Sequence, residues 1–207
     1  MDVSAIALSA VHPAHMLAGA ACDVRALVHV RVSGTGAGDV DASLQLWTPR
    51  GATIAVFCER APVLCDLRKR AVRVDDRTIA CAAGRWPVGA REYELVIALA
   101  PGRAGDEILA ARLAVIVDDE IADRALIPVT WTDDERLAAP RRPGGGAPVT
   151  PSVVAELPTG RSPVRRHAVV VAPSVTPCCP ACDLPAAEGD RFCECCGAAL
   201  GESAQKS

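Results

Sequence analysis

The chain has 207 residues, of which 50% are hydrophobic, 3% aromatic and 23% charged, and its formal net charge is −3. This length and composition allow one sizeable core and a small appendage. The weak negative charge gives no general attraction to nucleic acid or to an anionic membrane. No stretch reaches the roughly 18 apolar residues that a membrane-spanning helix requires, so we expect no membrane span.

The N-terminal residues 1–20 show no clear structural pattern and are taken as an extension. They begin with Met-Asp, lack a basic region, and are interrupted by His12-Pro13, which argues against a signal peptide. The ten cysteines would permit disulfides in an oxidising compartment. Metal-type spacing of several of them, without an export signal, favours a reducing one. We therefore expect a cytoplasmic protein.

Residues 21–136 are predicted to form an antiparallel β-sandwich. From Cys22 onward every second residue is apolar, while Asp23, Arg25, His29 and Arg31 occupy the alternate positions, which is the pattern of a half-buried strand. The inward residues expected on this strand are Cys22, Val24, Ala26, Val28, Val30 and Val32.

Further short strands follow between turn signals. In the returning strand, Leu44 and Leu46 are expected to face inward and Trp47 to face the opposite way. Residues 61–74 fit either irregular strands or a short helix, and both interpretations stay open. Short strands separated by turns over about a hundred residues are typical of a sandwich. The predicted strands after the first are 42–48, 53–58, 91–99, 110–117 and 121–130.

Residues 137–177 are predicted to be a disordered linker. They are rich in Pro, Gly, Ser and Thr, and include the run Arg142-Pro-Gly-Gly-Gly146. Such a composition buries too little apolar area to offset the conformational entropy lost on ordering. The linker carries several arginines, and a solvated tether is the favoured interpretation over a contact with an acidic partner or RNA.

The C-terminal cysteines carry the strongest signal in the chain. Cys179-Pro-Ala-Cys182 is followed after ten residues by Cys193-Glu-Cys-Cys196-Gly197, and two such pairs can place four thiolates around one structural Zn²⁺. Pro180 and Gly197 suit the two tight turns. The predicted metal ligands are Cys179, Cys182, Cys193 and Cys196.

Two cysteines remain outside this assignment. A ligand pair formed by Cys193 and Cys195 would have only one residue between its members, which is poor spacing for a metal-binding turn. Pairing Cys178 with Cys182 is possible but leaves Pro180 and Gly197 without a role. Reduced thiols without metal, or a disulfide, are the alternatives to a zinc site.

The tail resembles the short zinc ribbons found at the ends of many bacterial proteins. The resemblance rests on the cysteine pattern and on the segment Phe192–Leu200. It implies that the aromatic Phe192 packs under the metal site. The predicted ribbon spans residues 178–201, and residues 202–207 form a tail. A segment this short has few large apolar side chains, so metal binding would supply its folding energy.

The middle of the chain is similar to the β-domain that follows the von Willebrand factor A domain in a group of large actinobacterial proteins, which commonly end in such a ribbon. The chain would correspond to the C-terminal part of such a protein. The von Willebrand domain and the usual helical segment before the ribbon are both missing here, so that domain's ligand chemistry is not carried over. The matching segments are 44–51, 91–95, 101–112 and 129–135.

No enzyme is predicted. Nucleophilic catalysis needs a positioned base, and Cys22, Cys58, Cys65 and Cys81 have no evident histidine partner. Carboxylate pairs such as Asp118-Asp119 are adjacent in sequence, so on a strand they would point to opposite faces.

The function predicted from these features is that of an intracellular adaptor: a sandwich carrying a structural zinc ribbon that binds a protein partner. Nucleic-acid binding by the ribbon is one alternative, but acidic residues between the cysteine pairs would repel phosphate. Redox sensing is the other, with Cys178 and Cys195 resolving an oxidised ligand.

Overall fold

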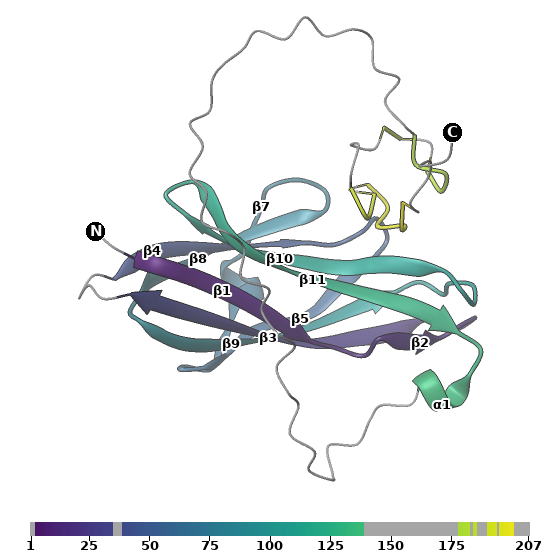
Figure 1. The fold of residues 1–207 in the computed structure, drawn as a ribbon, viewed down its shortest axis with the longest axis horizontal. Coiled ribbons are helices and arrows are strands. Elements are labelled where there is room, and N and C mark those ends of the chain that lie inside the picture. The colour runs from purple at the N-terminus through teal and green to yellow at the C-terminus, as the bar shows by residue number, and fades with distance from the viewer. Residues whose placement is uncertain are drawn as a thin grey trace, which may run out of the picture.

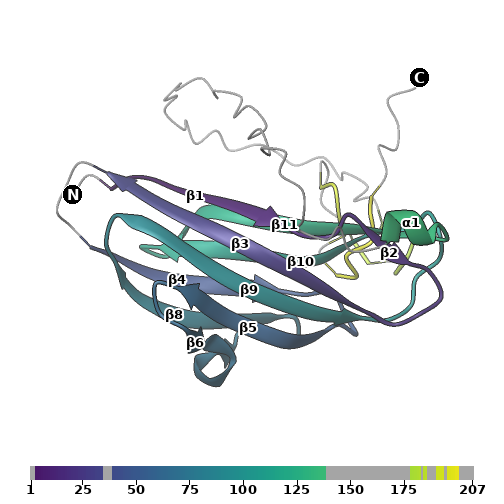
Figure 2. The ribbon, with the colours of Figure 1, turned by 90° about the horizontal axis from the view of Figure 1, so that it is seen from below.

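A computed structural model describes residues 3–34, 39–138, 178–182, 184–185, 190–193 and 195–200. Two β-sheets pack face to face (Figures 1 and 2), which confirms the predicted sandwich. Every strand pair is antiparallel except one. None of the described helices has the length and apolar character needed to span a membrane.

The first sheet has five strands, in the spatial order β1 (Val3–Val11), β3 (Cys22–Gly34), β9 (Gly89–Leu99), β5 (Thr53–Ala61) and β6 (Cys65–Asp66). The second has six, in the order β2 (His15–Leu17), β11 (Glu120–Thr132), β10 (Glu107–Val117), β4 (Val40–Trp47), β8 (Thr78–Trp86) and β7 (Val72–Arg73). A 3₁₀ turn, η1 (Leu67–Arg70), and one short helix, α1 (Glu135–Ala138), complete the described elements.

The N-terminal residues differ from the expectation of a patternless extension. β1 pairs antiparallel with β3, whereas β2 pairs parallel with β11 in the other sheet. The chain therefore crosses between the sheets around Pro13, a residue that cannot donate a ladder hydrogen bond. The N–H of Leu8 donates to Asp123 Oδ2 at 2.7 Å, which ties the edge strand β1 to β11.

The alternation in β3, β4 and β9 produces the core as predicted. Leu44, Leu46, Leu95 and Ile97 are fully buried between the sheets. β8 was not predicted because its alanines and Gly84 obscure the period of two. It nevertheless contributes Trp86, whose ring centroid lies 6.4 Å from that of Tyr93. Burial of these large side chains between the two sheets accounts for most of the apolar stabilisation.

The undecided segment 61–74 forms two very short strands around η1. Asp66 caps η1 by accepting a hydrogen bond from the N–H of Arg68 at 3.1 Å. β6 is the edge strand of the first sheet after β5, and β7 is the edge strand of the second sheet after β8. The segment therefore connects these two edges. The segment thus contains both short strands and a helical turn, so each of the two predicted alternatives holds for part of it.

The second sheet divides at its centre. β4 pairs with β10 only from Arg112 to Val117, and ends at Trp47 opposite Arg112. Residues 107–111 of β10, which we call the upstream half of β10, still pair with β11. Their other edge is not covered by β4, because the chain turns away at Pro49. This open position in the sheet receives the C-terminal segment described below.

We predict that Leu46→Ala lowers the free energy of unfolding by about 2–5 kcal/mol, because it removes a fully buried side chain and leaves a cavity. The measurement is urea-induced unfolding followed by tryptophan fluorescence. The control is Asp41→Ala on the same strand. Asp41 forms an ion pair with Arg85 at 3.9 Å, and both side chains are largely exposed, so this variant should cost less than about 1 kcal/mol. Equal losses for the two variants would contradict the assigned core.

Candidate metal centre

Two short hairpins place the four predicted ligands. In the first, the N–H of Cys179 donates to the carbonyl of Leu184 at 2.9 Å, and Cys178 bridges to Pro185. In the second, the N–H of Cys193 donates to the carbonyl of Ala198 at 2.8 Å. These backbone bonds turn the chain sharply at each cysteine pair, so that both sulfurs of each pair point to a common centre.

The sulfur of the first cysteine in each pair also accepts a backbone hydrogen bond. Ala181 N–H donates to Cys179 Sγ at 3.4 Å, and Cys195 N–H donates to Cys193 Sγ at 3.3 Å. Each bond holds the first sulfur of its pair inside the turn that the backbone makes between the two cysteines.

The four sulfurs form a compact cluster. Cys179 Sγ lies 3.6 Å from Cys196 Sγ, Cys182 Sγ lies 3.7 Å from Cys193 Sγ, and all four sulfurs lie within 4.8 Å of one another. A tetrahedron with metal–sulfur bonds of about 2.3 Å has sulfur–sulfur edges of about 3.8 Å. A disulfide requires about 2.05 Å. The spacing therefore fits a tetrahedral Cys₄ metal site with no open position.

Burial shapes the electrostatics of the cluster. Cys179 and Cys193 are fully buried, and Cys182 and Cys196 are half-buried. Burial raises the pKa of the Cys196 thiol above its ordinary value, and its contacts with the three other thiols act in the same direction. A cluster of four thiolates is consequently unfavourable in this position without a compensating cation.

The two remaining cysteines of the tail lie outside the cluster. Cys178 is exposed and Cys195 is half-buried, and neither sulfur belongs to the group of four within 4.8 Å. The structure thus brings together the four residues that spacing selected.

The second hairpin continues the second sheet of the sandwich. Leu109 N–H donates to the carbonyl of Gly197 at 2.8 Å, and Ala199 N–H donates to the carbonyl of Glu107 at 3.2 Å. Ile108 and Ala198 form the antiparallel bridge between these bonds. The ribbon therefore occupies the edge of the upstream half of β10 that β4 leaves uncovered. The ribbon is thus docked on the sandwich, whereas the linker predicted over residues 137–177 lies outside the described residues beyond Ala138.

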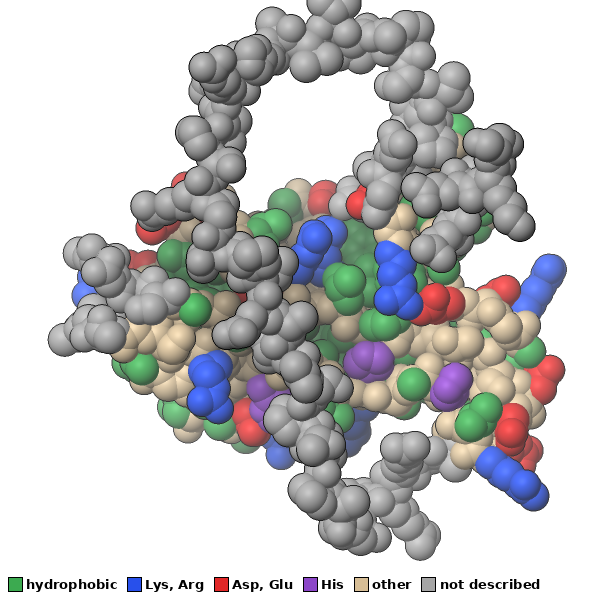
Figure 3. Space-filling view, viewed as in Figure 1, with side chains coloured by type: hydrophobic (Ala, Val, Ile, Leu, Met, Phe, Trp, Pro, Cys, Tyr) green, Lys and Arg blue, Asp and Glu red, His purple; other side chains and the backbone are tan. Residues whose placement is uncertain are grey.

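An apolar cluster lies on the outer face of the sheet beneath the ribbon. Trp47, Leu109 and Phe192 are buried against one another, and half-buried Ala199 packs beside them. This is why Trp47, predicted to face away from the core, is only 5% exposed. Phe192 packs into the contact with the sandwich, and Figure 3 shows hydrophobic side chains gathered in the middle of this face, over β10 and β11.

Arginines border this apolar cluster. The guanidinium of Arg112 lies 5.7 Å from the centroid of the Trp47 ring, and that of Arg191 lies 5.1 Å from the centroid of Phe192. Arg191 also pairs with Glu107 at 3.0 Å. The Arg191 side chain is largely exposed, so the ion pair contributes little to stability and mainly fixes the register of the ribbon on β10.

Gly197 makes the close approach possible. Its φ is +76°, and a Cβ placed on it would lie 2.8 Å from the carbonyl oxygen of Leu109 and 3.0 Å from Pro49 Cβ. No larger residue fits without displacing the backbone of β10. Gly197 therefore shapes both the second cysteine turn and the contact with the sandwich.

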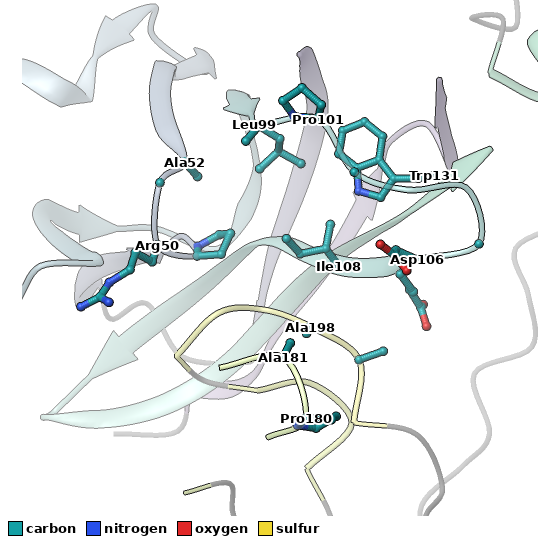
Figure 4. Close-up of a pocket in the computed structure, with 17 residues that line it drawn as sticks. Arg50, Ala52, Leu99, Pro101, Asp106, Ile108, Trp131, Pro180, Ala181 and Ala198 are labelled. Carbon is teal, nitrogen blue, oxygen red and sulfur yellow. The ribbon is translucent and has the colours of Figure 1, made fainter. Parts of the chain in front are cut away.

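A pocket of about 670 Å³ lies where the ribbon meets the end of the sandwich. Figure 4 shows Pro180, Ala181 and Ala198 of the ribbon opposite Ile108 and Trp131 of the sandwich. Its walls are mostly apolar, with few charged groups at the border. The ribbon forms one of its walls.

Docking was the feature that sequence reasoning missed. The available signals were a tryptophan on an outward position of β4 and Phe192 in a segment with few other apolar residues. Neither signal identifies its partner, since the contact joins residues about 145 positions apart in the chain. Hydrogen bonding of an edge depends on the backbone and leaves little trace in side-chain pattern.

Neither a family model nor a curated protein matches this chain. Among solved structures, it is similar to a protein described as von Willebrand factor type A from Catenulispora acidiphila, with 31% identity over 49% of this chain and a TM-score of 0.46. The matched part of this chain spans only 25% of the length of that protein.

Two other solved structures are similar at lower identity. The major pilin subunit of Bacillus cereus matches at 10% identity over 61% of this chain and 40% of that chain, with a TM-score of 0.42. A cohesin module from Clostridium perfringens matches at 12% identity over 64% of this chain and 98% of that chain, with a TM-score of 0.38. All three TM-scores lie below 0.5, and no functional conclusion follows from these likenesses.

We predict that Gly197→Ala loosens the ribbon on the sandwich, because the added Cβ meets the Leu109 carbonyl. The measurement is hydrogen–deuterium exchange at the Leu109 amide, which should accelerate about tenfold or more if docking loses about 1.4 kcal/mol. Gly51→Ala is the matched control. Gly51 has a similar φ of +84°, but its added Cβ meets nothing within 4 Å. Unchanged Leu109 exchange in Gly197→Ala would contradict the docked arrangement.

Proposed function

We propose that the protein is a non-enzymatic intracellular adaptor in which a structural Zn²⁺ folds the C-terminal ribbon and holds it on a β-sandwich. The observation that carries this proposal is the group of four cysteine sulfurs within 4.8 Å of one another. Four protein ligands fill a tetrahedral site, so no position is left for a substrate or a reactive water. A site of this kind would act structurally, by holding the ribbon in one conformation that a partner can bind.

The choice of zinc follows from the donor set. Four thiolates in tetrahedral geometry favour Zn²⁺ or an iron–sulfur centre among the common biological metals. Tight turns at both cysteine pairs, with sulfur–sulfur distances of 3.6 and 3.7 Å, suit a single ion. Thiolate ligation also requires reduced cysteines, which supports an intracellular location.

The adaptor role rests on how the ribbon is presented. Docking on the sheet edge turns a small segment into part of one rigid surface with the sandwich. A partner protein would meet the outward side of the ribbon together with the neighbouring exposed face of the second sheet. The sequence resemblance to a β-domain paired with a zinc ribbon supports a role within a larger von Willebrand-type assembly.

We predict one Zn²⁺ per chain, counted by native mass spectrometry of protein purified under reducing, chelator-free conditions. Changing Cys179 and Cys196 together to Ser should remove it, since two of four ligands are lost. The matched control is Cys178→Ser with Cys195→Ser, which removes two cysteines outside the cluster and should leave the zinc in place. A chain that carries no metal, or that loses it equally in both double variants, would refute the zinc assignment.

The adaptor role has its own test. Partners are crosslinked in cells that express the full chain, and compared between the wild type and the Cys179→Ser, Cys196→Ser variant. We expect at least one protein to be recovered with the wild type and with the Cys178→Ser, Cys195→Ser control, and lost with the ligand variant. Identical recoveries from all three would show that the ribbon does not present a partner surface.

A further inference from the structure

The docked ribbon covers backbone groups that would otherwise be free to pair with another strand. In the upstream half of β10, the Leu109 N–H and the Glu107 carbonyl are bonded to the ribbon, at 2.8 and 3.2 Å. The apolar side chains of Trp47 and Leu109 are covered by Phe192. Removal of the ribbon would expose both the hydrogen-bonding edge and the apolar surface beside it.

We propose that the ribbon is a metal-dependent cover for this edge, and that its release lets the upstream half of β10 pair with the same segment of a second copy of the chain. The proposal rests on the metal-binding role proposed above. Beyond that role, it names a second copy of the chain as the partner, the upstream half of β10 as the contact surface, and metal loss as the condition for pairing.

The upstream half of β10 has the character of a strand that pairs readily. Its residues Ile108-Leu-Ala-Ala111 carry no charge and include no proline. Proteins usually protect edge strands with charged residues, proline or a covering segment. The described residues provide only the last of these here, since the single charged residue of this half is Glu107 at its start.

The segment is also complementary to itself. In an antiparallel pair centred on Leu109, Glu107 of one copy lies opposite Ala111 of the other, and Ile108 lies opposite Ala110. No like charges meet, and the two Leu109 side chains come together next to Trp47 of each copy. Pairing of one surface with itself about a two-fold axis gives a closed dimer instead of a growing filament.

The sandwich limits how far this pairing extends. From Arg112 onward β10 is already paired with β4, so only residues 107–111 are available to a second copy. A contact of this length makes few hydrogen bonds and buries a small apolar area, as the ribbon does now. The ribbon competes successfully while it is folded, because its linkage to the same chain keeps its local concentration high.

Metal controls the competition because the ribbon has little else to fold it. Among the described residues of the ribbon, the buried side chains are those of Phe192, Cys179 and Cys193. Phe192 is held next to Cys193 in the second hairpin, so loss of the metal removes the geometry that presents Phe192 to Trp47. Release of the ribbon and exposure of the edge are then one event.

The test measures mass and edge protection together on the full chain. Sedimentation velocity with and without a zinc chelator, always with excess reductant, should show the 21.5 kDa monomer when metal is bound and a dimer of twice that mass at high concentration after chelation. Hydrogen–deuterium exchange at Leu109 should be slow in the metal-bound monomer, fast in the dilute metal-free monomer, and slow again in the dimer.

Three variants separate the steps. Phe192→Ala keeps all four cysteines and removes the anchor on Trp47, so it should dimerise with its metal still bound. Leu109→Lys places two charges opposite each other across the two-fold axis and should stay monomeric after chelation. Leu126→Lys is the matched control on the same sheet. Leu126 is 39% exposed and lies on β11, so this variant should dimerise like the wild type.

Several results would overturn the proposal. One is a metal-free wild type that remains monomeric at every concentration with Leu109 exchanging freely. A second is a metal-free monomer in which Leu109 stays protected, since the ribbon would then dock without metal. A third is equal dimerisation of the Leu109→Lys and Leu126→Lys variants, which would place the contact elsewhere. If the purified chain holds no metal, the proposed function fails, and Phe192→Ala still tests self-pairing of the edge by itself.

Discussion

The arrangement of the C-terminal region depends on the close approach of four cysteine sulfurs. They lie within 4.8 Å of one another, and four negatively charged sulfurs at this separation would repel one another without a cation between them. Zinc binding to sites of this type releases on the order of 10 kcal/mol or more. At the proposed zinc site, that free energy would be the main contribution to the folding of this short segment.

Docking of the ribbon also adds contacts to the sandwich, at the edge of β10. The upstream half of β10 gains two backbone hydrogen bonds and a cover for Trp47 only when the ribbon is folded. Anything that binds the folded state stabilises it by mass action, so a metal ion bound at the proposed site would also stabilise the ribbon and its contact with the β10 edge. The sandwich core, with Leu44 and Leu95 between the sheets, does not depend on this contact.

The predictable parts of the structure are those encoded by local pattern. Alternation in β3 and β9 reveals the inward faces, because side chains of neighbouring strand residues point to opposite sides. Cysteine spacing selects the four clustered sulfurs, because two tight turns fix which sulfurs can meet. The strand β8 was not predicted, because its alanines and glycine do not show which residues face the core. Residues 1–20 were not predicted as strands because alanines on both faces of β1 weaken its alternation, and β2 has only three residues. The docking of Phe192 on Trp47 could not be predicted, because it depends on tertiary contact between distant segments.

The division of the second sheet explains why the ribbon lies where it does. β4 pairs with β10 as far as Trp47 and then turns away at Pro49, so the upstream half of β10 keeps β11 on one side and lacks β4 on the other. A sheet interrupted in this way must find another strand, tolerate an exposed edge, or cover it. The ribbon supplies a strand, Gly197 lets it approach the Leu109 carbonyl, and Phe192 covers the tryptophan at the point of division. The four-cysteine cluster and the sandwich therefore meet at this edge: the second cysteine turn shapes the strand, and the interrupted sheet gives that strand a place to pair.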